Sequence, residues 1–141
     1  MQWLLEQDEI DWDELSNLYR IAPLGEKSAA DLRLVFTNSR FKCFVVDAGR
    51  LVGVGRAVAD GADCSYICDV AVHPDYQGRG LGRDIILRLK ELSAGHKKII
   101  LYANPGTEPF YRRLGFRPMR TAMAIFGDEA RAIRTGLVEG D

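Results

Sequence analysis

Apolar positions along the chain change between strand-like and helical spacing. Residues 41–47 and 50–59 read as two strands, and the Ala48-Gly49 pair between them is typical of a hairpin connection. Farther on, Leu81, Ile85 and Leu89 recur at the spacing of an amphipathic helix. The pattern predicts strands at 2–5, 41–47, 50–59, 65–72, 98–103 and 121–126, and helices at 13–19, 28–37, 81–94 and 107–114.

Capping residues support two of these helices. Ser28 is a favourable N-cap, with Asp31 at the capping-box position. Thr107 would cap a short helix that carries Pro109 in its first turn and ends at Gly115.

The length of 141 residues is that of one small domain, which buries roughly two-thirds of the surface of its unfolded chain. We expect one domain over residues 1–127 and a loosely ordered tail over 128–141, where apolar residues are few. The chain contains neither an apolar run of about 18 residues nor a signal-like N-terminus. A cytoplasmic protein without membrane contact is therefore expected.

Three cysteines, Cys43, Cys64 and Cys68, are spaced unlike the ligands of a zinc site. Their odd number also argues against a disulfide framework. Reduced thiols and no metal are predicted.

Charge is distributed unevenly along the chain. Residues 1–76 carry 7 basic and 13 acidic side chains, whereas residues 77–120 carry 10 and 3, giving net charges of −6 and +7. A positive segment of this kind can steer an anionic ligand. The whole chain has a net charge of −1 and no recognisable nucleic-acid-binding module, so a nucleic-acid partner is not expected.

A glycine-rich loop lies between the strand predicted at 65–72 and the helix predicted at 81–94. Its sequence is Gln77-Gly78-Arg79-Gly80-Leu81-Gly82. Glycines let successive backbone amides turn toward one point, and the following helix N-terminus adds its dipole, so the loop favours an anion such as a phosphate. The spacing fits neither the dinucleotide fingerprint nor the nucleoside-triphosphate loop, which leaves a phosphate site of another kind or a tight turn without a ligand.

Two segments resemble the GNAT superfamily of N-acetyltransferases. In its acyl-CoA signature, Gln or Arg is followed by two residues, Gly, one residue, and Gly or Ala, which Gln77, Gly80 and Gly82 match. The later segment with Asn104 and Tyr111 is similar to the downstream half of the family. The two segments cover roughly residues 65 to 117. The resemblance implies an α/β (α+β) fold whose mixed, mainly antiparallel sheet of six to seven strands has flanking helices and a splayed central pair.

The resemblance also implies an acyl-donor cosubstrate, acetyl-CoA, held by backbone groups and by the glycine loop. The donor-binding residues it implies are Val70, Ala71, Val72, Gln77, Gly78, Arg79, Gly80, Leu81, Gly82, Asn104 and Tyr111. Tyr111 matches the position from which many relatives protonate the departing thiolate; packing of its ring beside Phe110 and Phe116 is the structural alternative. Val72 is the first choice for the amide that stabilises negative charge on the thioester oxygen.

Asp69 interrupts the apolar run of a predicted strand. If it is buried there, an acidic residue needs a partner or has a raised pKa. A general base, an anchor for the amine and a purely structural hydrogen-bonding role all remain open for it. Direct attack of the amine on the thioester is expected, because no nucleophile, Cys68 included, has a convincing activating partner.

The acceptor is expected to be a primary amine, either an arylalkylamine, as in similar plant-type single-domain relatives, or a polyamine. Acetylation of protein N-termini or lysines, and a weakly catalytic CoA-binding regulatory domain, are the alternatives. The resemblance also allows a homodimer.

Overall fold

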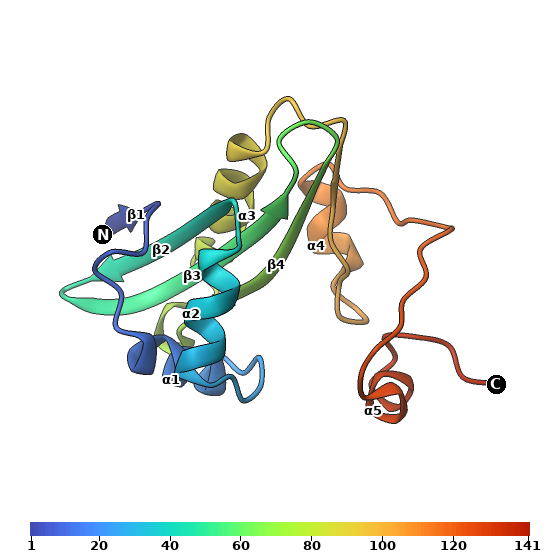
Figure 1. Cartoon of the computed structure of the whole chain (residues 1–141), viewed down its shortest axis with the longest axis horizontal. Helices are drawn as coiled ribbons and strands as arrows, with labels where there is room; N and C mark the ends of the chain where they lie inside the picture. Colours follow the sequence, from blue (N-terminus) through green and yellow to red (C-terminus); the bar gives the residue numbers. More distant parts are fainter. The chain divides into compact units, whose positions relative to one another are not determined.

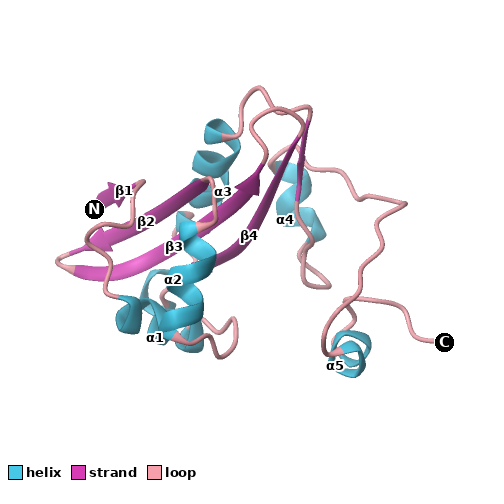
Figure 2. Cartoon of the chain, viewed as in Figure 1, coloured by secondary structure: helices cyan, strands magenta, loops and turns pink.

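A five-stranded sheet organises the first 101 residues of the chain (Figures 1 and 2). The computed structural model describes all residues from Met1 to Asp141, which form two units, Met1–Leu101 and Tyr102–Asp141. The elements of the first unit are β1 (Gln2–Leu4), α1 (Trp12–Ile21), α2 (Ala29–Thr37), β2 (Phe41–Asp47), β3 (Arg50–Ala59), β4 (Cys64–Val72), the 3₁₀ turn η1 (Pro74–Tyr76), α3 (Leu81–Leu92) and β5 (Lys98–Ile100).

The strands lie in the order β1-β2-β3-β4-β5. The first three pairings are antiparallel and the last, between β4 and β5, is parallel, so the mixed and mainly antiparallel sheet is confirmed. The parallel pairing stops at Tyr66 and Ile100, whereas β4 continues to Val72. Beyond Tyr66, β4 therefore has a strand partner on the β3 side alone, which is the splayed pair that the resemblance implied.

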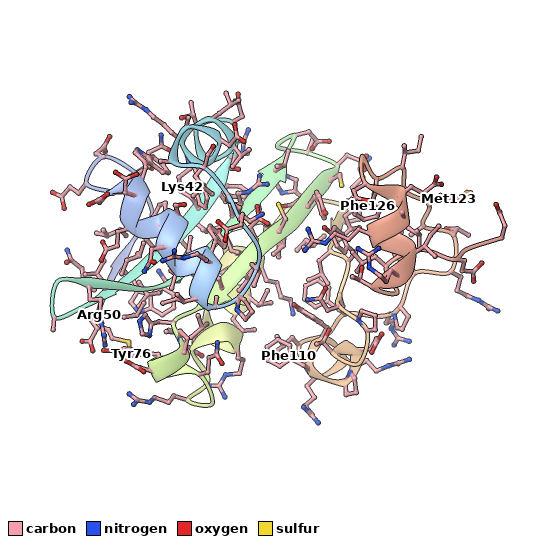
Figure 3. All side chains as sticks on the ribbon, turned by 90° about the horizontal axis from the view of Figure 1, so that it is seen from below. Lys42, Arg50, Tyr76, Phe110, Met123 and Phe126 are labelled. Carbon is pink, nitrogen blue, oxygen red and sulfur yellow. The ribbon has the colours of Figure 1, made fainter.

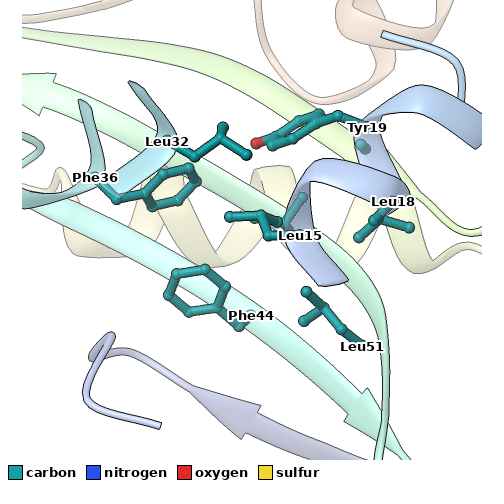
Figure 4. Packing of buried hydrophobic residues seen from close by; sticks show 9 residues of the cluster. Leu15, Leu18, Tyr19, Leu32, Phe36, Phe44 and Leu51 are labelled. Carbon is teal, nitrogen blue, oxygen red and sulfur yellow. The ribbon is translucent and has the colours of Figure 1, made fainter. Parts of the chain in front are cut away.

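Helices cover both faces of this sheet. Leu15, Leu18 and Tyr19 of α1 pack with Phe36 of α2 and Phe44 of β2 on one face, as Figure 4 shows. The capping prediction for α2 is confirmed, because the Asp31 amide donates to Ser28 Oγ at 3.1 Å.

Helix α3 packs against the opposite face, over two glycines of β3. A Cβ on Gly53 would lie 2.9 Å from Ile85 Cδ1, and one on Gly55 would lie 2.8 Å from Ile85 Cγ2 and 2.9 Å from Leu89 Cδ1. These glycines let α3 approach the sheet closely, which fixes the position of the helix N-terminus next to the end of β4.

The second unit, Tyr102–Asp141, contains two short helices, α4 (Glu108–Arg113) and α5 (Glu129–Arg134). Thr107 precedes α4 as expected, but its hydroxyl donates to the Asn104 carbonyl at 2.6 Å and makes no cap. Helix α5 begins after Asp128, whose carboxylate accepts from the Arg131 amide at 3.0 Å. It lies in the segment expected to be a loose tail, and the domain boundary at residue 127 stays a prediction.

Two strand predictions were wrong: one strand is shorter than predicted and the other does not form. The sheet has five strands where six to seven were expected, and the strand predicted at 98–103 ends at Ile100. Residues 121–126 are irregular (Figure 2), and Met123, labelled in Figure 3, lies among them. Met123 and Ile125 are 96% and 103% exposed. A strand needs a neighbour for its backbone hydrogen bonds, and the second unit contains no strand. None of the helices is long and apolar enough to cross a membrane.

Candidate active site

The glycine loop lies between β4 and α3, as the sequence predicted, and the 3₁₀ turn η1 precedes it. Gly78 and Gly80 have φ values of +79° and +82°, the left-handed region that residues with a Cβ rarely adopt. Gly80 is the N-cap of α3 and offers no side chain to cap it, while its carbonyl accepts the first helical bond from the Asp84 amide at 3.0 Å. The amides of the first turn therefore point out of the helix toward the loop, where an anion can accept from them.

Gln77, the first residue of the signature, holds the loop in place. Its side-chain amide donates to the carbonyls of Ala22 and Val72, each at 3.0 Å. One side chain thus fastens the glycine loop both to the end of β4 and to the segment after α1. The geometry makes Gln77 a structural anchor of the glycine loop.

Arg79 lies over an aromatic ring of the preceding turn. Its guanidinium carbon is 5.1 Å from the centroid of the Tyr76 ring, and that of Arg50 is 5.5 Å from the same ring. The Tyr76 hydroxyl donates to the Asp47 carboxylate, which fixes the ring, and Figure 3 shows Arg50 beside Tyr76. The loop therefore has a cation oriented by stacking.

The end of β4 leaves backbone groups available on one edge. The His73 amide donates to Val52 of β3 at 2.8 Å, and because strand residues alternate in direction, the N–H groups of Val72 and Val70 face the opposite edge. The pairing with β5 has already ended there. Gln77 takes the Val72 carbonyl on this edge, and the Val72 amide remains directed into the opening.

Asp69 stands at an irregularity of the same strand. Arg56 of β3 pairs with Cys68 and Val54 pairs with Ala71, so β4 has one more residue than β3 between these pairs. Asp69 has a φ of +57°, a left-handed conformation that costs a residue with a Cβ about 1–2 kcal/mol. The bulge changes the direction of the strand immediately before Val70.

Three side chains hold this strained residue. Arg56 Nε donates to Asp69 Oδ2 at 2.9 Å, and Lys27 Nζ lies 3.5 Å from Oδ1. The Tyr19 hydroxyl donates to the Asp69 carbonyl at 2.7 Å. Burial first, and then the Asp69 carboxylate, raise the pKa of Tyr19 well above its usual value, so the hydroxyl stays protonated and continues to donate.

The Cys68 thiol is half-buried in β4. Burial raises its pKa to about 11, so the thiolate is scarce near neutral pH. No group of three His, Cys, Asp or Glu side chains in the structure is arranged to hold a metal ion.

The second unit carries the other two predicted site residues. Asn104 is exposed before α4, and its carbonyl accepts from the Thr107 amide at 3.1 Å. Tyr111 lies on α4, where its ring packs edge-on against Phe110 at 5.0 Å and Phe116 at 6.1 Å between centroids. Burial raises the pKa of Tyr111, which keeps the phenol protonated as a proton donor must be.

The structure thus brings the predicted β4 segment, Asp69 and the glycine loop together in the first unit. Sequence reasoning missed Lys27, which reaches Asp69 from the loop between α1 and α2. The sequence pattern also did not predict that Arg56 pairs with Asp69. The usable signal was a pair of opposite charges, Arg56 and Asp69, placed in neighbouring apolar strands, because such charges need partners.

Comparison with known proteins gives a consistent result. The Acetyltransferase (GNAT) family matches residues 5–116. An uncharacterized N-acetyltransferase, ycf52, of Porphyra purpurea is 46% identical over 69 residues, covering 48% of this chain and 40% of that protein. The chloroplastic serotonin N-acetyltransferase 2 of rice, Oryza sativa subsp. japonica, is 45% identical over 71 residues, covering 49% of this chain and 36% of that protein. These alignments span well under half the length of either relative.

The fold has solved counterparts as well. A probable acetyltransferase of unknown function from meticillin-resistant Staphylococcus aureus superposes with a TM-score of 0.77 at 22% identity, covering 89% of this chain and 98% of that one. At this identity the likeness concerns the fold alone. With a family match over most of its length, and with the signature loop, the splayed β4–β5 pair and the α3 N-terminus arranged as described, the chain belongs to the GNAT acetyltransferase family.

Proposed function

We propose that this protein transfers an acetyl group from acetyl-CoA directly to a primary amine. The observation that carries the proposal is the opening at the end of β4, where unpaired backbone amides lie next to the glycine loop and the uncapped N-terminus of α3. Family membership supports it. Acetyl-CoA, when bound, supplies an acyl group activated as a thioester.

The loop suits the pyrophosphate of this donor. A Cβ on Gly78 would meet no atom within 4 Å, so the space above the loop is open to a ligand. The amides of the first turn of α3 and the stacked Arg79 offer donors and positive charge at one place. Hydrogen bonds to a charged group contribute about 1.5–3 kcal/mol each, so several of them anchor the donor.

The strand supplies the groups for the acyl end. We assign the Val72 amide to the thioester oxygen, because it points into the opening beyond the end of the β4–β5 pairing. A donor at such a position typically lowers the barrier by about 3 kcal/mol. Val70 would hold the pantetheine arm through its backbone groups, whereas Ala71 pairs with Val54 and its backbone groups face β3, which argues against the donor-binding role expected for it. For Asn104 the role of holding the arm is proposed from the resemblance alone.

Tyr111 is the proposed acid for the departing thiolate. We expect Tyr111→Phe to lower kcat about 100-fold while the KM for acetyl-CoA changes little, because the phenol acts in the transition state alone. The comparison is made by release of free CoA with the best amine substrate. An unchanged kcat would leave Tyr111 with the packing role that its contacts to Phe110 and Phe116 also support.

For Asp69, the anchoring role is favoured over that of a base. Both carboxylate oxygens already face cations, Oδ2 toward Arg56 and Oδ1 toward Lys27, which is the surrounding of a group that binds a positive charge. We propose that the amine loses its proton to water. The value of kcat/KM should then rise with pH and level off once the pH exceeds the pKa of the amine itself. The pH at which it levels off should shift when an amine of different pKa is used. A profile independent of the amine would favour a base on the protein.

A small arylalkylamine is the proposed acceptor, with support from the similarity to the rice protein named for serotonin.

The first experiment is thermal unfolding with acetyl-CoA, since saturation at 100 times Kd stabilises a protein by about 2.7 kcal/mol. Transfer is then measured between pH 7 and 9 with tryptamine, spermidine and a lysine-containing peptide. Transfer to spermidine or to the peptide without transfer to tryptamine would reject the arylalkylamine. Donor binding without any transfer would favour a regulatory domain.

A further inference from the structure

The ammonium group of Lys27 lies between a carboxylate and an aromatic ring. Its Nζ is 3.5 Å from Asp69 Oδ1 and 5.5 Å from the centroid of the Tyr19 ring. A carboxylate and the face of an aromatic ring are the two groups that proteins use most readily to hold a primary ammonium. Lys27 therefore fills a site with the chemistry of an ammonium receptor.

The two cations at Asp69 are held with different strength. Arg56 makes a hydrogen bond of 2.9 Å, its side chain is 14% exposed, and it also donates to Ser39 at 3.2 Å. Lys27 is 28% exposed, and its distance of 3.5 Å exceeds the range of a good N–H···O bond. The pair is half-buried and has no close hydrogen bond, so we expect it to resemble an exposed ion pair, which shifts an equilibrium by at most about fivefold. Another ammonium can displace Lys27 at little cost, whereas Arg56 stays.

Only the side chain of Lys27 has to move for this exchange. Ser16 Oγ donates to the Lys27 carbonyl at 2.5 Å and fixes the backbone of the loop. The vacated oxygen would belong to the residue immediately before Val70, where β4 turns toward its open edge. An amine bound there lies beside the segment assigned to the acyl group.

We propose that Asp69 Oδ1 and the Tyr19 ring form the binding site for the ammonium of the acceptor, and that Lys27 is a tethered competitor which the acceptor displaces. This inference rests on the proposed function and narrows its substrate class. The acceptor carries its ammonium on a methylene carbon, as Lys27 itself does. Amines with a carboxylate beside the nitrogen are disfavoured, because that charge would lie against Asp69.

Kinetics of Lys27→Met test the competition. The variant keeps an unbranched side chain of similar length and removes the charge, so the KM for tryptamine and for spermidine should fall two- to fivefold with the KM for acetyl-CoA unchanged. Arg33→Met is the matched control, since Arg33 is exposed on α2 and its removal changes the net charge equally; it should leave both KM values unchanged. An amine KM that stays the same or rises in Lys27→Met overturns the proposal.

Asp69→Asn tests the receptor side. Asn tolerates the left-handed backbone that Asp69 adopts, so the fold is kept while the charge is lost. The KM for tryptamine should rise at least tenfold, with acetyl-CoA binding retained in thermal unfolding. An amine KM within twofold of the parent protein's would show that Asp69 does not bind the acceptor.

A measurement without turnover separates this proposal from the proposed function. In protein labelled with ¹³C at the lysine ε carbons, millimolar tryptamine should shift the Lys27 signal, assigned by its loss in Lys27→Met, and leave the other lysines unchanged. A shift without acetyl transfer to any amine would retain the ammonium site and reject the enzyme. Transfer without a Lys27 shift would retain the enzyme and reject the competitor.

Discussion

The glycine loop and the Asp69 bulge lie at the two ends of the same short stretch of chain, and they are built in opposite ways. The loop from Gln77 to Gly82 presents backbone amides, and its left-handed positions are glycines that adopt this conformation without strain. The bulge also contains a left-handed residue, but it is an aspartate held by Arg56, Lys27 and Tyr19.

This difference determines which substitutions each site tolerates. Binding by a loop that acts through its amides should weaken when a Cβ is added to the loop, and it should change little when side chains elsewhere are exchanged. A bulge held by ion pairs depends on the partners of one side chain, because those contacts offset the strain of its backbone. Donor binding should therefore respond to backbone changes, and acceptor binding and local stability to charge changes.

The largest effect is expected from Asp69→Ala. The variant loses a charge-assisted bond to Arg56 of about 1.5–3 kcal/mol, and it places Ala in a left-handed conformation that Asp tolerates better and that costs an ordinary residue with a Cβ about 1–2 kcal/mol. Urea denaturation should show a loss of about 2–4 kcal/mol in the free energy of unfolding. Asp69→Asn should lose less, because Asn accepts the backbone conformation; equal losses would mean that strain plays no part.

Gly80→Ala should weaken acetyl-CoA binding about tenfold or more. Its Cβ would be forced into a left-handed position and would lie 3.0 Å from the Arg83 side chain, which displaces the amides of the loop. Gly95→Ala is the control: Gly95 also has a positive φ, +94°, but nothing lies within 4 Å. Titration calorimetry should find the loss in Gly80→Ala alone. Equal weakening in both variants would point to general destabilisation.

Gly82→Ala should change acetyl-CoA binding little, which would show that this position of the signature does not require the absence of a Cβ. A Cβ here would meet Val72 Cγ2 at 3.7 Å, an ordinary contact, and the residue lies in the first turn of α3. Because Ala is the better helix former by up to about 1 kcal/mol, the thermal midpoint should rise slightly. Acetyl-CoA affinity should stay within threefold, and a large loss would mean that the ligand needs the space of this glycine.

The smallest effect concerns Asp60, whose carboxylate is held by backbone amides like the anion expected at the loop. The amides of Ala62, Asp63 and Cys64 donate to it and lower its pKa from 3.8 to about 2. Its stabilising contribution is therefore fully present above pH 3.8 and is lost as the pH falls toward 2. Asp60→Asn should lower the melting temperature slightly at pH 6, and the difference should vanish near pH 2; a difference independent of pH would exclude the charge as its cause.

Much of the first unit could be predicted from local patterns. The strands at 41–47 and 50–59, the helix after Gly80 and the left-handed turns at Gly78 and Gly80 depend on residues close together in sequence, so periodicity and glycine placement are sufficient. The strand predicted at 121–126 failed because alternation reports which side chains are apolar and says nothing about whether another strand is present to pair with them.

The contacts around Asp69 could not be predicted in the same way. Tyr19 and Asp69 are 50 residues apart, and nothing local indicates that the hydroxyl of one meets the carbonyl of the other. The left-handed conformation of Asp69 likewise has no periodic signature, since it arises from a register difference between β3 and β4. Contacts between distant charges become visible once the sheet and α1 are in place.

The anchor between Ser16 Oγ and the Lys27 carbonyl has a consequence for evolution and for engineering. Because the backbone at position 27 is fixed independently of its side chain, a single codon change there exchanges the group facing Asp69 without remodelling the loop. Under the proposed competition for Asp69, position 27 is a place where substrate range would drift among descendants of one ancestral gene. A saturation library at this codon would then yield variants with altered amine preference.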